Sequence, residues 1–234
     1  MDLESYIESH STAEDEYLYR LWRATNLCLV RPHMVSGHTE GLLLKMLVQM
    51  IRPRNILEIG TFTGYSAIAM SYALSPEAKI YTFDVNDELE DFARRWIAGS
   101  PRASSIVYTI GDVLDILPRF AATHGGLRFD MVFIDGNKRQ YVEYFNLAKR
   151  FLTPGGYILA DNTLWDGHVT DSAYDRDSQT LGIRAFNDCA LADNDFEKVI
   201  IPVRDGLTLM RRTPRQKNAA TQGADTNCRY KLNE

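Results

Sequence analysis

Short apolar runs alternate with amphipathic segments along this 234-residue chain, and this alternation constrains its fold more than any other feature. The runs NILEIG, KIYTFD, SIVYTI and DMVFID are each followed by a stretch with helical periodicity, and GYILAD comes after the last of these. Strands that are apolar along their whole length need cover on both faces, which crossover helices provide in parallel sheets. The pattern predicts an α/β fold with a mostly parallel sheet and helices on both faces.

The last two apolar runs, EKVIIPV and GLTLMRR, are joined tightly at Arg204-Asp205-Gly206. A parallel crossover needs a dozen or more residues, so a link this short requires antiparallel pairing. The full prediction is a Rossmann-like, seven-stranded sheet that ends in a C-terminal antiparallel β-hairpin.

One domain is expected over residues 1–212. Segments 16–30 and 40–51 have helical periodicity and should form N-terminal helices that cover the ligand-binding rim or an oligomer interface. A globule of this size can bury roughly 70 to 75% of its unfolded surface, which is enough for one core. Residues 213–234 are polar and lack periodicity, so a disordered tail is expected there.

Composition and charge exclude several classes of protein. The formal net charge of −5 argues against a nucleic-acid partner, because phosphate binding draws on clustered Lys and Arg. No apolar run approaches the roughly 20 residues that span a membrane, and the acidic N-terminus lacks the apolar segment of a signal peptide. The three cysteines are too widely spaced for a zinc motif. A cytoplasmic protein without a membrane partner is expected.

Oxygen-bearing side chains end two of the predicted strands. Asp135 follows MVFI, and Asp161 and Asn162 follow YILA. The carboxyl ends of parallel strands meet at one edge of a sheet, so these three side chains should lie close together. Each could serve alone as a helix cap or a turn residue. Together, two carboxylates and an amide predict a site for a hard cation such as Mg²⁺, with Ca²⁺ or Mn²⁺ as other ions of that kind.

The loop after the first strand suits a particular cofactor. Gly60 and Gly64 allow close approach of a ligand, but the G-x-G-x-x-G spacing of a pyrophosphate site is absent. Asp84 ends the second strand, where a carboxylate can accept hydrogen bonds from ribose hydroxyls. Glu58 adds negative charge that favours a ligand with an ammonium or sulfonium group. Turn chemistry alone would explain the glycines, whereas the four residues together predict S-adenosylmethionine (SAM).

Three longer motifs carry a resemblance to a known family. LEIGTFTGYSA, FDMVFIDGNKRQY and GGYILADNTLWDG resemble segments of the class I cation-dependent SAM O-methyltransferases. This family contains the catechol and caffeoyl-coenzyme A O-methyltransferases, and the bacterial branch is the most similar. The match runs from about residue 34 to residue 212.

The resemblance implies roles for individual residues. Its metal ligands fall on Asp135, Asp161 and Asn162, and its catalytic lysine, a general base, falls on Lys138 beside Asp135. The predicted cofactor contacts are Val35, Ser36, Glu58, Gly60, Thr61, Ser66, Asp84, Asp112, Val113 and Asp135.

The acceptor site is less defined. Trp165 is predicted to form an aromatic wall for a planar acceptor, with a plain core position as the alternative. Asp166 stands where the plant enzymes have an Asn that touches substrate, so we expect it to bind substrate but cannot carry the acceptor over from the family. Tyr141 and Tyr144 are expected to be packing residues.

The sequence therefore predicts a Mg²⁺-dependent O-methyltransferase that moves the methyl group of SAM to a hydroxyl of a small catechol-like, ortho-dihydroxy aromatic acceptor. A homodimer is expected. One alternative is methylation of 5-hydroxyuridine in tRNA, for which Arg211, Arg212, Arg215 and Lys217 form one local basic cluster. A second alternative, of another class, is a non-catalytic SAM-binding module.

Overall fold

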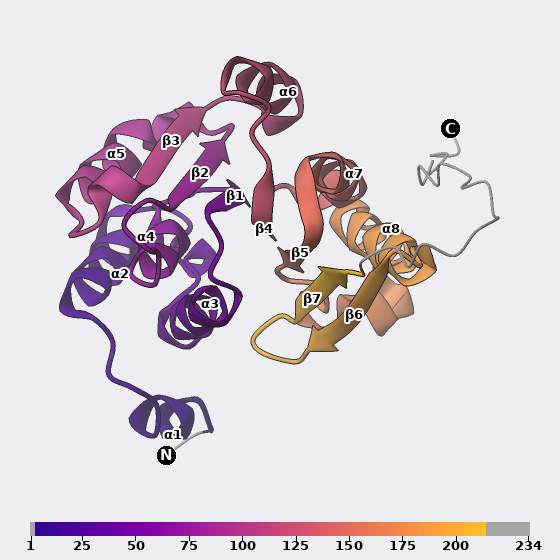
Figure 1. Cartoon of the computed structure of the whole chain (residues 1–234). Coiled ribbons are helices and arrows are strands. Elements are labelled where there is room, and N and C mark those ends of the chain that lie inside the picture. Colours follow the sequence, from indigo (N-terminus) through magenta and orange to yellow (C-terminus); the bar gives the residue numbers. More distant parts are fainter. Residues whose placement is uncertain (1–2, 214–234) are drawn as a thin grey trace. The chain divides into compact units, whose positions relative to one another are not determined.

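The computed structural model of the chain describes residues 3–213 (Figure 1). Within them the strands follow the order β3-β2-β1-β4-β5-β7-β6 in a seven-stranded sheet. The strands are β1 Asn55–Ile59, β2 Lys79–Asp84, β3 Ile106–Ile110, β4 Phe129–Ile134, β5 Leu152–Ala160, β6 Phe196–Ile201 and β7 Leu207–Arg212. The α-helices are α1 Leu3–Ser9, α2 Glu16–Cys28, α3 His38–Ile51, α4 Tyr65–Ser71, α5 Glu90–Gly99, α6 Val113–Thr123, α7 Tyr141–Phe151 and α8 Ser178–Ala192. The predicted fold class is confirmed.

The chain divides into two compact units, Met1–Asp115 and Ile116–Glu234, with the boundary inside α6. The single domain expected over residues 1–212 stays a prediction. The predicted disordered tail lies, apart from Thr213, outside the described residues. No helix between residues 3 and 213 is long and apolar enough to cross a membrane.

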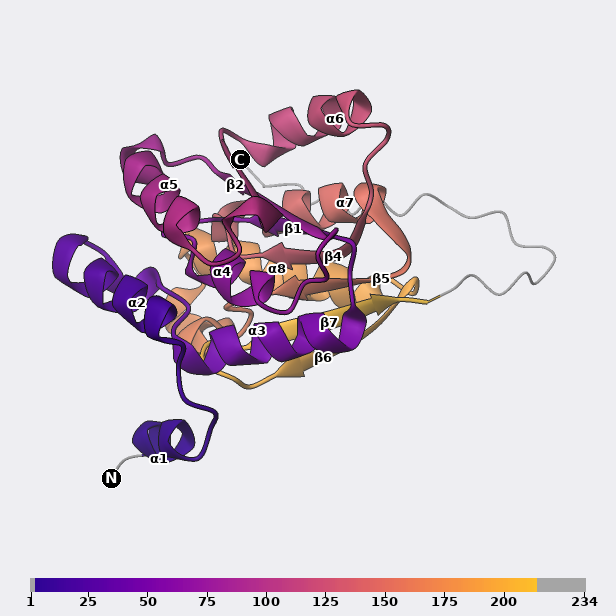
Figure 2. The same ribbon diagram turned by 60° about the vertical axis from the view of Figure 1, so that its left-hand side comes forward.

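The first unit is built on three parallel strands. β1 pairs with β2 and β2 pairs with β3, so that Ile59 stands opposite Phe83 and Asp84 opposite Ile110. Every residue of α4 is buried, since this helix packs against both α3 and β2 (Figure 2). The close approach of α3 depends on Gly41, where an added Cβ would lie 2.8 Å from the Tyr65 ring. This packing fixes α4 directly behind the glycine loop.

The second unit pairs β4 with β5 in parallel and continues antiparallel through β7 to β6. The helices α7 and α8 pack together around an aromatic cluster. Phe186 of α8 meets Tyr141 and Phe145 of α7 edge to face, with ring centroids 5.6 and 5.7 Å apart. Phe145 also contacts Phe196 of β6 at 5.7 Å. Aromatic pairs of this kind contribute roughly 0.5–1.5 kcal/mol each beyond their buried area, so α7 and α8 form a rigid base for the strand ends.

The start of α8 and several short helices were not predicted from the sequence. α8 begins at Ser178 because the Asp177 carboxylate caps it, accepting from the Thr180 backbone N–H at 2.7 Å and from the Thr180 hydroxyl at 2.8 Å. The polar connection before it holds two short 3₁₀ helices, Trp165–Thr170 and Ser172–Tyr174. α1 was not foreseen, because it is only seven residues long and its described residues are almost all exposed.

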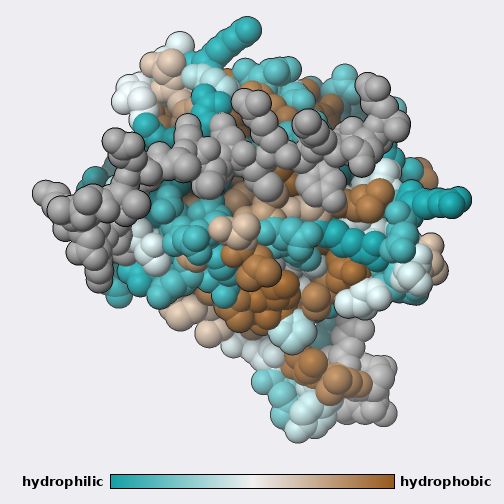
Figure 3. Space-filling view, turned by 90° about the vertical axis from the view of Figure 1, so that its right-hand side faces the viewer, coloured by the Kyte–Doolittle hydropathy of each residue, from teal (hydrophilic) through white to brown (hydrophobic). Residues whose placement is uncertain are grey.

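Strand β6 stands at the end of the strand order and leaves apolar side chains in solvent. Val199 is 54% exposed and Ile200 42%. Figure 3, which looks from the side of β6 and α8, shows apolar side chains grouped among hydrophilic ones on this face. Exposed apolar groups on an edge strand are a common feature of surfaces that pair with another chain.

The β6–β7 turn provides a sharp test of packing. Gly206 has φ +86°, and an added Cβ would overlap the Leu164 side chain, whereas Gly125 has φ +67° and nothing within 4 Å of its added Cβ. Both changes to Ala carry the cost of positive φ, about 1 kcal/mol, but only Gly206→Ala adds a steric clash of typically 1–3 kcal/mol. Urea unfolding of the two variants should show a clearly larger loss for Gly206→Ala. Equal losses would contradict the tight contact.

Candidate functional site

The glycine loop of the first unit is held by the carboxylate that ends β2. Asp84 Oδ2 accepts the backbone N–H groups of Thr61 at 3.0 Å and Phe62 at 2.6 Å, and its Oδ1 accepts that of Asn86 at 2.9 Å. Phe62 has φ 48°, which an ordinary residue adopts only when its surroundings hold it there. Asp84 is therefore a structural clamp of the loop, and Oδ1 keeps acceptor capacity for a ligand hydroxyl.

Glu58 and Ser66 meet beneath the same loop. The Ser66 hydroxyl donates to Glu58 Oε1 at 2.6 Å, and both side chains are buried, Glu58 completely. A carboxylate removed from water is costly unless a positive or hydrogen-bonding group stays near it. The loop itself needs its glycines, because Gly60 and Gly64 have φ +101° and +85°. The buried Glu58 carboxyl group lies beside a loop whose glycines leave the backbone accessible, and this combination suits a cationic ligand.

The other predicted cofactor residues are placed as follows. The segment with Asp112 and Val113 joins Asp84 through the Gly111 N–H, which donates to the Asp84 carbonyl at 2.7 Å. The Asp112 carboxylate accepts the Leu114 N–H at 2.8 Å, at the start of α6. Val35 and Ser36 are buried just before α3.

In the second unit, the predicted metal ligands follow two neighbouring parallel strands. Ile134 stands opposite Ala160, and the Asp161 N–H donates to the Ile134 carbonyl at 3.0 Å, so Asp135 and Asp161 emerge side by side. Asn162 has φ 57°, a left-handed conformation that Asn tolerates better than most residues. Among residues 3–213 no group of three His, Cys, Asp or Glu side chains could hold a metal; the predicted triad combines two carboxylates with an amide.

A largely buried ammonium group, that of Lys138, lies beside the Asp135 carboxylate. Lys138 Nζ donates to Asp135 Oδ1 at 2.8 Å and to the Tyr141 hydroxyl at 2.7 Å. The Tyr141 hydroxyl in turn donates to the Asp161 carbonyl at 3.0 Å. The Lys138 side chain is only 9% exposed. One chain of contacts thus connects the ends of β4 and β5 through Lys138 and Tyr141.

Helix α8 supports this region from behind. An added Cβ at Gly182 would overlap the Lys138 carbonyl oxygen and lie 2.9 Å from Arg139 Cα, so the glycine lets α8 touch the Lys138 turn directly. Thr163, the residue after the predicted metal ligands, is also held in place. Asn187 Nδ2 donates to the Thr163 carbonyl at 2.9 Å, and the Thr208 hydroxyl donates to that of Thr163 at 2.8 Å.

The predicted substrate residues lie at the next turn of the chain. The Trp165 ring faces Lys138 Nζ at 5.9 Å, which places this aromatic side chain beside the predicted base. Trp165 and Asp166 both have positive φ, 48° and 50°. The backbone of the β6–β7 turn holds them, since the Asp205 carbonyl accepts the Leu164 N–H at 2.7 Å and the Trp165 N–H at 3.3 Å. Burial, and then the hydrogen-bonded carboxyl group of Asp166, raise the pKa of Asp205.

Comparison with known proteins identifies the kind of chain that carries these two groups of residues. A model of the O-methyltransferase family matches residues 8–213. The chain belongs to the O-methyltransferase family. The predicted family and the predicted enzyme class, a SAM-dependent O-methyltransferase, are confirmed.

Named relatives agree with this membership. Caffeoyl-CoA O-methyltransferase 1 of Eucalyptus globulus is 34% identical over 188 residues, covering 76% of this chain and 75% of that protein. Catechol O-methyltransferase of Niastella koreensis is 35% identical over 183 residues, covering 76% of this chain and 82% of that protein. Tricin synthase 2 of Oryza sativa subsp. japonica is 34% identical over 185 residues, and the match covers 63% of its length.

Solved O-methyltransferases have the same fold. The O-methyltransferase TomG from Streptomyces achromogenes, in complex with SAM, superposes with a TM-score of 0.81 at 32% identity, over 90% of this chain and 96% of that one. The O-methyltransferase from Bacillus cereus, in complex with SAH, has a TM-score of 0.82 at 27% identity, over 90% and 97% of the two chains.

Sequence reasoning missed three parts of this O-methyltransferase's site. Tyr141 packs as expected, but its hydroxyl also links Lys138 to the Asp161 carbonyl, and its position three residues after Lys138 was the available signal. Gly182 and Asp205 were not singled out. Their contacts join segments more than 35 residues apart, which no local pattern can reveal.

The raised pKa of Asp205 makes stability depend on pH in a defined direction. The folded chain holds this proton more tightly than the unfolded chain, so the stability it contributes is complete below the ordinary carboxyl pKa and is lost as pH rises through the raised value. Asp205→Asn imitates the protonated form and should unfold at a higher temperature than wild type at pH 7, with the difference shrinking towards pH 4. The exposed Asp188 provides the control, Asp188→Asn. A pH-independent difference would refute the role of Asp205.

Proposed function

We propose that this O-methyltransferase binds Mg²⁺ through Asp135, Asp161 and Asn162 and transfers the methyl group of SAM to one hydroxyl of a small ortho-dihydroxy aromatic acceptor. The observation that carries the proposal is the juxtaposition at the ends of β4 and β5. Two aspartates emerge there side by side, and one of them already binds a buried ammonium group. The named relatives include a catechol and a caffeoyl-CoA O-methyltransferase, which supports an aromatic acceptor.

The residues present fit a hard divalent cation. Carboxylate and amide oxygens are the ligands that Mg²⁺ and Ca²⁺ prefer, and three protein ligands leave room for water and acceptor. When bound, the ion would act as a Lewis acid that makes the acceptor hydroxyl easier to deprotonate. The Lys138 ammonium occupies Asp135 Oδ1, so it would compete with the ion for that oxygen, while Asp135 Oδ2 and the Asp161 and Asn162 side chains would remain as ligands.

Lys138 is proposed as the general base, a role it can take only as the neutral amine, after the ammonium group bound to Asp135 has released a proton to solvent. Its amine is held by Asp135 and by the Tyr141 hydroxyl, so its position is fixed to within a hydrogen bond of the predicted metal ligands. Proton transfer by a positioned side chain contributes typically 10²–10⁴-fold to a rate, and the geometry of the base matters first. No covalent nucleophile is needed for a direct methyl displacement.

The first unit supports SAM as the methyl donor. Buried Glu58 supplies negative charge for a cationic ligand, and Asp84 Oδ1 keeps capacity to accept a ribose hydroxyl. Solved relatives carry SAM or SAH, which agrees with this cofactor. The individual contacts predicted from the sequence, including those of Val35, Ser36 and Asp112, belong to the proposal.

A tRNA acceptor is less well supported than a small molecule. Two residues of the basic cluster that favoured RNA are already engaged. Arg212 donates to the Lys149 carbonyl at 2.7 Å and to the Leu152 carbonyl at 3.1 Å, and Arg211 lies over the Tyr157 ring at 5.8 Å. Arg215 and Lys217 lie outside the described residues.

The expected homodimer and cytoplasmic location also stand as proposals. The exposed apolar residues of β6, Val199 and Ile200, support an interface between two copies at this edge. A cytoplasmic location agrees with the net charge and with the SAM supply that such an enzyme needs.

Turnover with a panel of acceptors tests the proposed function. Labelled SAM should methylate an ortho-diol much faster than the matched monophenol, because only the diol can replace two waters of the ion. EDTA should abolish this turnover and Mg²⁺ should restore it. Full activity without a metal would contradict the cation site, and methylation of hydroxylated tRNA while every diol is inert would replace the small acceptor by RNA.

A further inference from the structure

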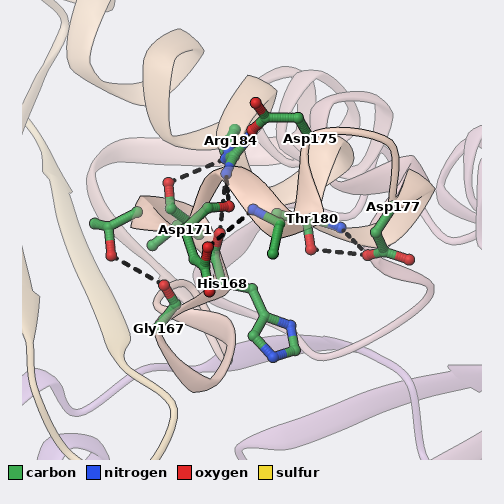
Figure 4. Close-up of polar contacts among 10 residues, drawn as sticks. Gly167, His168, Asp171, Asp175, Asp177, Thr180 and Arg184 are labelled. Atoms are coloured by element: carbon green, nitrogen blue, oxygen red, sulfur yellow. Dashed lines mark hydrogen bonds and ion pairs between the residues drawn. The ribbon is translucent and has the colours of Figure 1, made fainter.

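One side chain of α8 makes several contacts with the segment between the predicted metal ligands and that helix (Figure 4). Arg184 of α8 donates through Nε to the Val169 carbonyl at 3.0 Å. Its Nη2 donates to the carbonyls of His168 at 3.0 Å and Asp171 at 2.8 Å. Its Nη1 forms an ion pair with Asp175 at 2.6 Å. Four interactions of one guanidinium group thus span the two 3₁₀ helices of this segment.

The segment has little else to fix it. Neither 3₁₀ helix, Trp165–Thr170 or Ser172–Tyr174, has a buried residue, so no apolar core anchors residues 165–175. Asp166 and Gly167 interrupt the first of these helices with positive φ. The stacked rings of His168 and Tyr174, 3.5 Å apart, tie the segment to itself but not to the rest of the unit. Its placement on α8 therefore rests on polar bonds, and Arg184 makes four of them.

The segment begins at the site described above. Trp165 faces Lys138 Nζ at 5.9 Å, and Asp166 follows it. A shift of residues 168–175 would pass along the backbone to these two positions, since both are held in a strained conformation that only their surroundings maintain. A displacement of about 1 Å in a positioning group can cost 10²-fold in rate.

We propose that Arg184 is a positioning residue for the acceptor: by binding the carbonyls of His168, Val169 and Asp171 it fixes the segment 165–175, and with it the wall that determines which hydroxyl of an ortho-diol is methylated. This inference rests on the proposed function, because it assigns a role in acceptor binding at the same site. Arg184 touches neither Lys138 nor a predicted metal ligand in the described contacts, so it acts through the segment.

Planar geometry explains why arginine stands here. A guanidinium group presents five N–H donors in a fixed fork and binds several acceptors at once, whereas a lysine ammonium is a point charge on a flexible stem. Arg184→Lys keeps the charge near Asp175 but cannot span three separate carbonyls. Asp175→Asn removes the ion pair and leaves the three carbonyl bonds. These two variants separate the clamp from the charge.

Steady-state kinetics of Arg184→Met, Arg184→Lys and Asp175→Asn with an unsymmetrical ortho-diol test the proposal. Both Arg184 variants should raise the KM for the diol about tenfold or more, with a smaller change in kcat, and should move the ratio of the two methylated products towards equality. Asp175→Asn should stay close to wild type. Hydrogen exchange should be faster over residues 168–175 in both Arg184 variants, while the apolar face of α8 keeps them folded.

The possible failures are distinguishable. A wild-type protein that methylates no diol overturns the proposed function. Active Arg184 variants with wild-type KM and product ratio overturn the role of Arg184 alone, whether or not exchange is faster. An Asp175→Asn variant as impaired as Arg184→Lys would mean that the ion pair, and not the carbonyl clamp, positions the segment, which also contradicts the proposal.

Discussion

The partly buried ion pair between Lys138 and Asp135 is the interaction on which the candidate site of the second unit depends. A lysine with a side chain only 9% exposed is tolerated because Asp135 and the Tyr141 hydroxyl accept hydrogen bonds from its ammonium group. Removing one partner of a fully buried pair typically costs about 3–5 kcal/mol, and the cost should be smaller here because the Asp135 side chain is 20% exposed. The same pair holds the Asp135 side chain at the edge of the sheet where Asp161 also emerges. A metal ion bound by Asp135 would compete with the Lys138 ammonium group for the same carboxylate.

The surrounding structure keeps the pair in place. α8 touches the Lys138 turn at Gly182, fixes the Thr163 carbonyl through Asn187 and holds the following segment through Arg184. The helix α8 thus supports three parts of the candidate site: the Lys138 turn, the Thr163 carbonyl and the segment after it. The first unit uses an analogous device, since Asp84 clamps the glycine loop through two backbone N–H groups, those of Thr61 and Phe62. In the first unit, a carboxylate that the sequence motifs present as a ligand contact also stabilises the backbone around it.

The sequence predicted the fold well because each signal was local. Apolar runs predicted the seven strands, and helical periodicity predicted the helices between them. The short link at Arg204–Gly206 required the antiparallel pair. Strand ends also brought Asp135 and Asp161 together correctly, since parallel strands share an edge. Non-local contacts were beyond reach. No pattern near Gly182, Arg184 or Asp205 in the sequence indicates that they contact residues 9 to 44 positions away.

Metal affinity of Lys138→Met tests the central claim most directly. If Asp135, Asp161 and Asn162 bind a divalent cation, removing the neighbouring ammonium group takes away a repulsive charge and frees an Asp135 oxygen. Calorimetric titration with Mn²⁺ should then show binding at least about tenfold tighter than in wild type, or about 1.4 kcal/mol. Methyl transfer by the same variant should fall roughly 10²-fold or more, because the base is lost. Unchanged or weaker Mn²⁺ binding in the folded variant would contradict a cation site beside Lys138.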